Sequence, residues 1–189
     1  MNLSRGFTLV ELLVTIAIIA VVASVAVPSV QEALATQRIK SAAHNLSNTF
    51  AEARYQAAMQ RLSVDVVSSG SGVFWKASTA SSNGAVQWYV APSTDSNNRI
   101  METAVDHRVS IRTDLSSEAE MKIRFLPNGN IALADESSAP LAGTTVFRIC
   151  DTGVPNHDGY TVTLNSFGSS RVMIGKVAGL GSVGASSCT

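Results

Sequence analysis

The chain has 189 residues, 46% of them hydrophobic, which is material for one modest domain with an appendage and too little for two separate cores. Its 14 basic and 14 acidic residues cancel, so no overall field attracts the protein to nucleic acid or anionic lipid. The three histidines and two cysteines show no spacing typical of a metal site, and we expect no metal or other cofactor.

The first predicted element is an apolar helix near the amino terminus. From Phe7 to Val27 there are 21 residues, nearly all Leu, Val, Ile or Ala, and about 20 are needed to cross a bilayer as a helix. The amino terminus and Arg5 carry the positive charge before this run, so the positive-inside tendency places that end in the cytoplasm. The run therefore predicts a single-pass membrane helix with the rest of the chain outside.

A carboxylate interrupts this apolar run close to its start. Placing Glu11 against lipid costs a few kcal/mol on insertion scales. A cleavable secretory signal is the alternative, because VASVAVP at residues 22–28 imitates a small-residue cleavage site. A discarded signal has no reason to carry the acid, so Glu11 favours a retained helix and requires a partner for its charge.

The stretch RGFTLVE at residues 5–11 resembles the prepilin signature of type IV pilins and of the pseudopilins of type II secretion. The resemblance implies a leader over residues 1–6, cut between Gly6 and Phe7 by a prepilin peptidase on the cytoplasmic side. It also implies methylation of the new amine of Phe7. The chain is then a substrate of these enzymes and not an enzyme.

The rest of the sequence offers little to catalysis. It contains no nucleophile elbow, phosphate-binding loop, dinucleotide fingerprint or zinc pattern. Paired acids such as Asp135 and Glu136, or Asp151 near Asp158, lie in polar stretches. We interpret them as solvated side chains.

The prepilin resemblance also gives Glu11 a partner. About one helical turn separates Glu11 from Phe7, and helices are staggered in a filament. The carboxylate can therefore pair with the Phe7 ammonium of a neighbouring subunit, because each charge alone is costly in a low dielectric while the pair is tolerable. The alternative is a pair with the amine of the same subunit.

Pro28 divides the predicted helix into two halves. A proline removes a backbone donor and crowds the preceding turn, so we expect a kink or local opening there. Beyond it charged residues appear, and apolar positions from Ile39 to Ala57 recur at three- and four-residue steps. We predict a transmembrane or filament-core helix over 7–28 and an amphipathic helix over 29–62 that packs on a globular head.

Residues 63–189 are predicted to form this β-rich head. Short strand-like runs begin at 64, 73, 85, 108, 121, 144, 160 and 170. Alternation is clear in Tyr160, Val162 and Leu164, where Thr161 and Thr163 are expected to meet water. The stretch FLPNGNIAL at 125–133 is a strong hairpin signal, and polar stretches at 68–72, 79–84 and 93–98 are predicted loops.

A long helix followed by antiparallel strands is an α+β arrangement, with one twisted sheet or two smaller sheets covered by the amphipathic half of the helix. This arrangement resembles the pilin fold, and the PNG hairpin, late cysteine and final strand resemble the minor pilin group called FimT/FimU and the pseudopilin GspH. The resemblance implies a minor type IV pilin that helps initiate or cap pilus assembly. A type II secretion pseudopilin is the alternative.

The same resemblance implies partners and a location. The partners are other pilins and minor pilins through the amino-terminal helices, the prepilin peptidase, and the inner-membrane assembly machinery. The location is the bacterial inner membrane, with the amino terminus cytoplasmic and the head periplasmic, and then the pilus or pseudopilus.

Cys150 and Cys188 both follow the apolar run, which suits one disulfide in an oxidising compartment. The bond would close the 39-residue segment between them, stabilise the head by about 3 to 4 kcal/mol in the loop-entropy model, and hold the tail. The alternative is two free thiols. Pilus-associated minor pilins often have such a bond and pseudopilins generally lack it, so the cysteines favour a pilus.

A DNA-binding role is a further alternative. FimT-like pilins of natural transformation bind DNA through a Gly-Arg-x-Arg motif near the carboxyl terminus. The comparable stretch here is GSSR at 168–171, in which serine replaces the first arginine. Arg171 and Lys176 alone supply little phosphate-driven affinity, so we expect a solvated strand face and no nucleic-acid partner.

Overall fold

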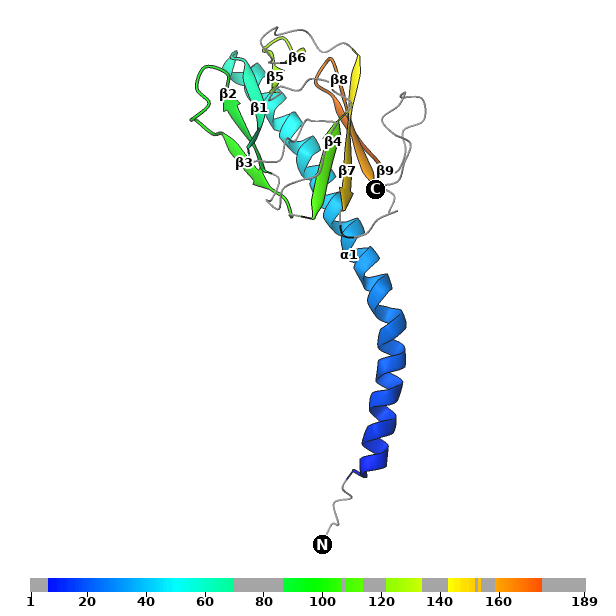
Figure 1. Ribbon diagram of the computed structural model, residues 1–189. Coiled ribbons are helices and arrows are strands. Elements are labelled where there is room, and N and C mark those ends of the chain that lie inside the picture. The colour runs from blue at the N-terminus through cyan, green and yellow to red at the C-terminus, as the bar shows by residue number, and fades with distance from the viewer. Residues whose placement is uncertain are drawn as a thin grey trace.

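The computed structural model describes residues 7–69, 87–106, 108–113, 122–133, 143–151, 153 and 159–174. Within these residues one long helix, α1 (Leu9–Gln60), is followed by nine strands. The strands are β1 (Val64–Ser69), β2 (Gln87–Pro92), β3 (Met101–Ala104), β4 (Val109–Thr113), β5 (Ile123–Phe125), β6 (Ile131–Leu133), β7 (Thr144–Asp151), β8 (Tyr160–Asn165) and β9 (Ser170–Ile174). The first half of α1 extends as a stalk from a head that contains the second half and all the strands (Figure 1).

The ends of α1 lie within two residues of the predicted bounds. Thr8 is the N-cap, and its hydroxyl accepts a hydrogen bond from the backbone N–H of Glu11 at 3.2 Å, which satisfies one of the unpaired donors of the first turn. The helix ends at Gln60, where Arg61 adopts a left-handed conformation with φ 54°. A left-handed residue is a common helix terminator.

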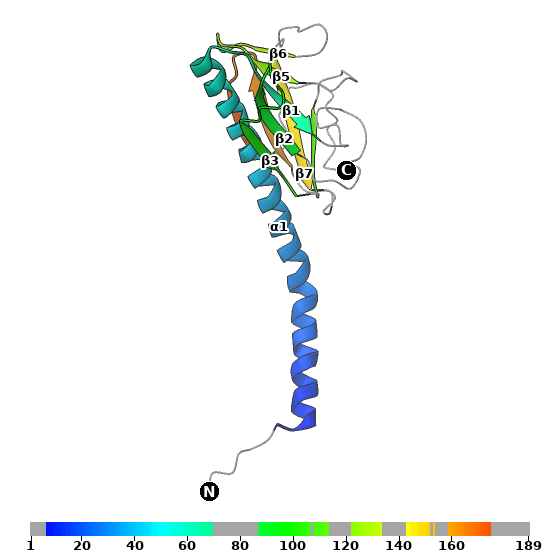
Figure 2. The ribbon, with the colours of Figure 1, turned by 90° about the vertical axis from the view of Figure 1, so that its left-hand side faces the viewer.

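The stalk does not continue the axis of the head half. The segments Leu9–Ser24 and Ser29–Gln60 lie at 41° to each other, and both ribbon views show the curve (Figures 1 and 2). Among the described residues no single helix is long and apolar enough to cross a membrane, whereas this bent pair meets the criterion by length and composition.

The strands form two antiparallel sheets. The five-stranded sheet has the order β3-β2-β1-β5-β6, and the four-stranded sheet has the order β4-β7-β8-β9. Both sheets contact α1, which runs along one side of the head while the strands lie on the other (Figure 2). The predicted α+β fold, in its two-sheet form, is confirmed.

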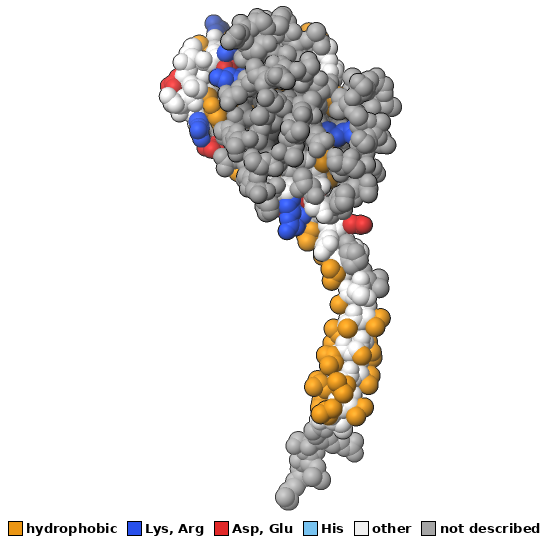
Figure 3. All heavy atoms as spheres, viewed as in Figure 1, with side chains coloured by type: hydrophobic (Ala, Val, Ile, Leu, Met, Phe, Trp, Pro, Cys, Tyr) orange, Lys and Arg blue, Asp and Glu red, His pale blue; other side chains and the backbone are white. Residues whose placement is uncertain are grey.

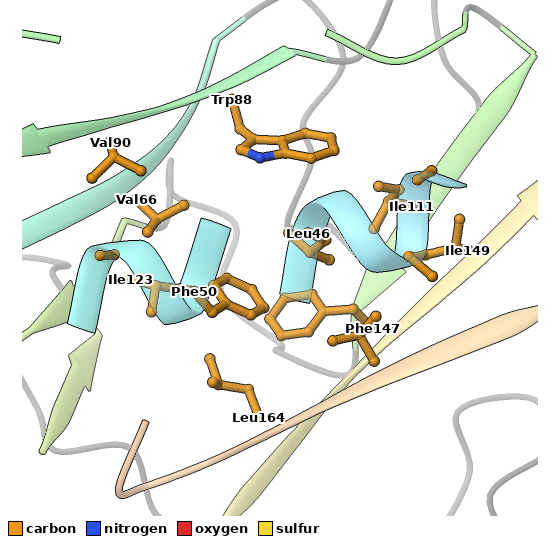
Figure 4. Close-up of a cluster of buried hydrophobic side chains, with 14 of the residues drawn as sticks. Leu46, Phe50, Val66, Trp88, Val90, Ile111, Ile123, Phe147, Ile149 and Leu164 are labelled. Carbon is orange, nitrogen blue, oxygen red and sulfur yellow. The ribbon is translucent and has the colours of Figure 1, made fainter. Parts of the chain in front are cut away.

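The core lies between the second half of α1 and both sheets. The helix residues that were predicted to form the apolar stripe are buried there, namely Ile39, Ala42, Ala43, Leu46, Phe50, Ala53 and Ala57. Phe50 contacts Phe125 of β5 and Phe147 of β7, with ring centroids 6.1 Å and 5.3 Å apart. One helix side chain therefore joins the two sheets (Figure 4).

The β5–β6 hairpin forms as the sequence predicts. Gly129 has φ 85°, a conformation that glycine adopts without steric cost, and its N–H donates to the carbonyl of Leu126 at 2.9 Å. The side chain of Asn128 accepts a hydrogen bond from the N–H of Asn130 at 3.0 Å, which is a typical Asx turn. The turn chemistry thus fixes the register of this hairpin.

Several details of the head differ from the prediction. The sequence did not predict β3, whose residues alternate between half-buried and exposed. Thr161 was expected to meet water and is 2% exposed, because β8 lies between β7 and β9 and its cross-strand neighbours on that face are the long side chains of Arg148 and Met173. The run predicted from residue 73 and the loop predicted at 79–84 lie outside the described residues.

Candidate assembly site

The start of α1 displays the residues that the prepilin signature singles out. Phe7 is 77% exposed and precedes the Thr8 cap. Glu11 is exposed and lies in the first turn, where the partial positive charge of the helix terminus favours a carboxylate. In the part of the chain that the structure describes, Glu11 forms no ion pair. Gly6 lies outside the described residues.

The stalk half of α1 is apolar on every side. Its large exposed hydrophobic residues are Leu9, Val10, Leu12, Leu13, Val14, Ile16, Ile18, Ile19, Val21, Val22, Val27 and Val30. Figure 3 shows hydrophobic side chains along the visible face of the stalk. A helix that is hydrophobic all round is stable only when it is buried in lipid or among other chains. The stalk is therefore a binding surface along its whole length.

An arginine ties α1 to the head where the stalk begins. Arg38 Nη1 lies 3.1 Å from Asp151 Oδ2, and its Nε lies 3.6 Å from Asp106 Oδ2. Asp106 follows β3 and Asp151 ends β7, so this guanidinium joins the helix to the same end of both sheets. The side chain of Asp151 is fully buried and also accepts a hydrogen bond from the N–H of Gly153 at 2.8 Å.

The interpretation of Asp151 as a solvated acid is therefore wrong. The sequence did contain a signal, because Asp151 directly follows the apolar run TTVFRIC, and a carboxylate at the end of a buried strand is stable only with partners. Its partner Arg38 lies 113 positions away. That separation is why the sequence alone did not reveal the pair.

A second ion pair fastens two strands of the five-stranded sheet. Arg124 of β5 donates to Asp65 of β1 from Nε at 2.7 Å and from Nη2 at 2.9 Å. These hydrogen bonds and the negative charge of Asp65 raise the pKa of Arg124 above its ordinary value, although burial opposes the shift. The arginine therefore stays charged at every working pH, and this contact is structural.

The remaining predicted site residues are dispersed. Cys150 is 6% exposed and is disulfide-bonded. Cys188 lies outside the described residues, so its identity as the partner stays a prediction. Arg171 is exposed on β9, and Lys176 lies outside the described residues. Among the described residues, no three His, Cys, Asp or Glu side chains gather in a way that could hold a metal ion.

Two family models match the chain. The prokaryotic N-terminal methylation motif matches residues 1–27, and the model of the type II transport protein GspH matches residues 42–168, which is more than half of the chain. No curated protein sequence matches significantly.

Solved structures with a similar fold come from pili and from secretion systems. The type IV minor pilin FimU of Pseudomonas aeruginosa is 16% identical, with a TM-score of 0.50 over 74% of this chain and 90% of that chain. The minor pseudopilin EpsH from the type 2 secretion system of Vibrio cholerae is 12% identical, with a TM-score of 0.49 over 72% of this chain and 97% of that chain. At this level of identity, the likeness to FimU shows the fold alone.

Proposed function

The chain belongs to the GspH family of type II transport proteins, and from this premise we propose that it acts as a minor type IV pilin that helps initiate or cap a pilus. The family makes it a minor pilin or pseudopilin. The observation that carries the proposal is the exposed, wholly apolar stalk of α1, which begins with one carboxylate and lies within a matched N-terminal methylation motif.

The proposed mechanism is structural. The peptide bond between Gly6 and Phe7 is cut on the cytoplasmic side, and the amine of Phe7 is methylated. Before assembly the stalk spans the inner membrane, with the head in the periplasm. On assembly the stalk leaves the lipid and packs against the stalks of other subunits. The packing of apolar helices offsets the lost lipid contacts.

Glu11 sets the register in this scheme. Its carboxylate pairs with the Phe7 ammonium of an adjacent subunit, and the stagger of one helical turn fixes how far each subunit rises above the next. Removing one partner of a buried ion pair costs about 3 to 5 kcal/mol, because the other charge stays buried and unpaired. Incorporation is thus the step that depends on Glu11.

A pseudopilus is the second assignment, because EpsH comes from a secretion system. The disulfide-bonded Cys150 supports the pilus, since minor pilins of pili often carry such a bond and pseudopilins generally lack it. Members of such families are typically substrates of the prepilin peptidase and have no enzymatic activity of their own. We assign the chain the same role.

The substitution Glu11→Ala tests the proposal. We expect normal insertion, a normal mass for the mature chain starting at Phe7, and at least about a tenfold loss from sheared filaments, since every 1.4 kcal/mol is a factor of ten. Mass spectrometry of the cellular protein and quantitative immunoblotting of filaments provide the readouts.

Glu32→Ala is the matched control, because Glu32 is an exposed acid on the same helix beyond Pro28. We expect wild-type incorporation of this variant. An intact leader on the cellular protein, a mature terminus near Val25, or wild-type incorporation of Glu11→Ala would contradict the proposal.

A further inference from the structure

A groove of about 490 Å³ lies between the outer face of α1 and the β8–β9 turn, near the far end of the head. The residues that supply its polar groups are Ser47, Asn48, Arg54, Tyr55, Ser169 and Ser170. Hydroxyls, one amide and one guanidinium face this groove, and none of its lining residues in the described part of the chain is an acid. The groove therefore presents donors and one positive charge.

Two turn glycines hold Arg54 in place. A Cβ atom on Gly168 would lie 3.1 Å from Arg54 Cδ, and one on Gly129 would lie 3.8 Å from Arg54 Nη2. Both glycines have positive φ, 75° and 85°. The bare backbones of the β8–β9 and β5–β6 turns thus form the surface on which the arginine lies.

These two turns are themselves fastened together. The N–H of Ile131 donates to the carbonyl of Ser166 at 3.0 Å, and Ser170 Oγ lies 2.8 Å from Ser47 Oγ of α1. The surface on which Arg54 lies is therefore held by hydrogen bonds from β6 and from α1.

The donors of Arg54 are available to a partner. Its side chain is exposed, and within the described residues no hydrogen bond or ion pair engages it. A guanidinium presents its N–H groups as a planar fork that matches a carboxylate in two parallel hydrogen bonds. No acid among the described lining residues occupies this fork, so an acidic side chain from outside would complement its charge.

Two exposed aromatic residues lie in the groove or next to it in the chain. Tyr55 lines it and is 55% exposed, and Phe167, which precedes Gly168, is 66% exposed. Arginine and tyrosine are enriched among the residues that contribute most to protein interfaces. A nucleic acid would instead favour a track of several cations, and in the described part of the chain Arg54 is the only cation that lines this groove.

We infer that this groove receives an aspartate or glutamate from the head of a neighbouring filament subunit, with Arg54 as its bidentate partner. The inference rests on the proposed function. Arg54 lies 43 positions after Glu11, which is about 65 Å along a helix at about 1.5 Å per residue. The groove is thus a second contact between subunits, at the level of the heads and independent of the stalk.

The test uses the full-length chain in cells that assemble filaments. A photoreactive phenylalanine analogue replaces Ser169, whose side chain is exposed at the groove. We expect crosslinks to another filament subunit at a peptide that contains Asp or Glu. Arg54→Glu should reduce the crosslink about tenfold, as expected for loss of a central interface arginine, and a Lys substitution of the crosslinked acid should restore it.

Lys40→Glu is the matched control, because Lys40 is an exposed cation on the same helix and is not among the residues that line this groove. Its crosslink yield should equal that of the parent. Membrane levels and protease resistance of each variant confirm that the head is folded.

The experiments distinguish a wrong inference about the groove from a wrong proposed function. An unchanged crosslink in Arg54→Glu, crosslinks to lipid alone, or an Arg54-dependent gel shift with DNA would overturn the groove inference while Glu11→Ala still reduces incorporation. If the wild-type chain is absent from sheared filaments, the proposed function fails, and the groove inference fails with it.

Discussion

One buried threonine connects the helix to the five-stranded sheet through hydrogen bonds. Trp88 of β2 is the largest fully buried side chain, and its indole N–H donates to Thr49 Oγ1 at 2.8 Å. The same hydroxyl donates to the carbonyl of Asn45 at 2.8 Å. A buried indole N–H needs an acceptor, so Thr49 allows a tryptophan to lie against α1.

Thr49→Val should therefore destabilise the head at nearly constant volume. Valine keeps the shape but cannot accept the indole proton, and an unsatisfied buried donor costs about 1 to 3 kcal/mol. We expect the free energy of unfolding in urea to fall by that amount, with tryptophan fluorescence as the probe.

Thr163→Val is the control, because Thr163 is half-buried and its hydroxyl lies 3.3 Å from the carbonyl of Arg171. This substitution should change the free energy of unfolding by no more than about 0.5 kcal/mol. An equal decrease in the free energy of unfolding in Thr49→Val and Thr163→Val would show that the hydrogen bond to Trp88 gives no specific stabilisation.

Single residues differ in how far the sequence reveals them. Glu11 could be singled out as a candidate because a charge inside an apolar run is conspicuous without any partner in view. Arg38 and Asp151 were missed because each is an ordinary charge locally, and only the fold brings them to 3.1 Å. Residues that act through distant partners need the tertiary structure.

At the scale of elements, α1 is one helix with two environments. Its head half buries an apolar stripe against both sheets, and its stalk half exposes apolar side chains all round. The 41° bend separates the two at residues 25–28, which include Pro28. The hydroxyls of Ser24 and Ser29 bond to the carbonyls of Val21 and Ala26 at 2.7 Å and 2.9 Å. Such bonds also bend helices.

We attribute the bend chiefly to Pro28, and Pro28→Ala tests this. Alanine restores the missing N–H and removes the clash with the preceding turn, and an interior proline costs about 3 kcal/mol in a helix. Hydrogen exchange of amides 24–31, measured in detergent micelles, should slow by at least about tenfold, since every 1.4 kcal/mol is a factor of ten.

Ser29→Ala removes one hydroxyl bond but leaves the proline in place, so its exchange rates should change far less than those of Pro28→Ala. Unchanged exchange in Pro28→Ala would mean that the neighbouring serines or the surroundings cause the bend.

Elements with strong local signals were predicted well. The helix predicted in two halves, 7–28 and 29–62, is observed at Leu9–Gln60, because a long apolar run is followed by an apolar stripe at three- and four-residue steps. The β5–β6 hairpin was found because Asn128 and Gly129 belong to one turn type. β3 has only four residues with half-exposed alternation, so no local pattern separates it from a loop.

At the scale of the whole molecule, the order of the strands could not be predicted. β1 pairs with β2 and with β5, so the chain leaves the first sheet, builds β4 of the second sheet and then returns. Nothing local encodes that crossover. The crossover fits the packing of both sheets on one helix. There, Phe50 is buried by one phenylalanine from each sheet, Phe125 and Phe147.

The proposed bond between Cys150 and Cys188 acts on the whole head. Cys188→Ser should lower the free energy of unfolding by about 3 to 4 kcal/mol, because the unfolded chain regains the freedom of a 39-residue loop. Urea unfolding with and without reductant measures the loss.

Reduction should bring the wild type to the stability of the variant and leave the variant itself unchanged. Two titratable thiols in the native wild type, or equal stability of the oxidised wild type and Cys188→Ser, would rule out the bond.

The attachment of both sheets to one helix determines how the head bears tension. A pull on the stalk acts parallel to the interface between α1 and the strands and loads Arg38, whose carboxylate partners are Asp151 at the end of β7 and Asp106 in the connection between β3 and β4. The force is thereby divided between two anchors and then spread over the buried stripe that ends at Ala57. Many contacts must slide together before either sheet can separate from α1, so this arrangement resists a pull along the helix axis.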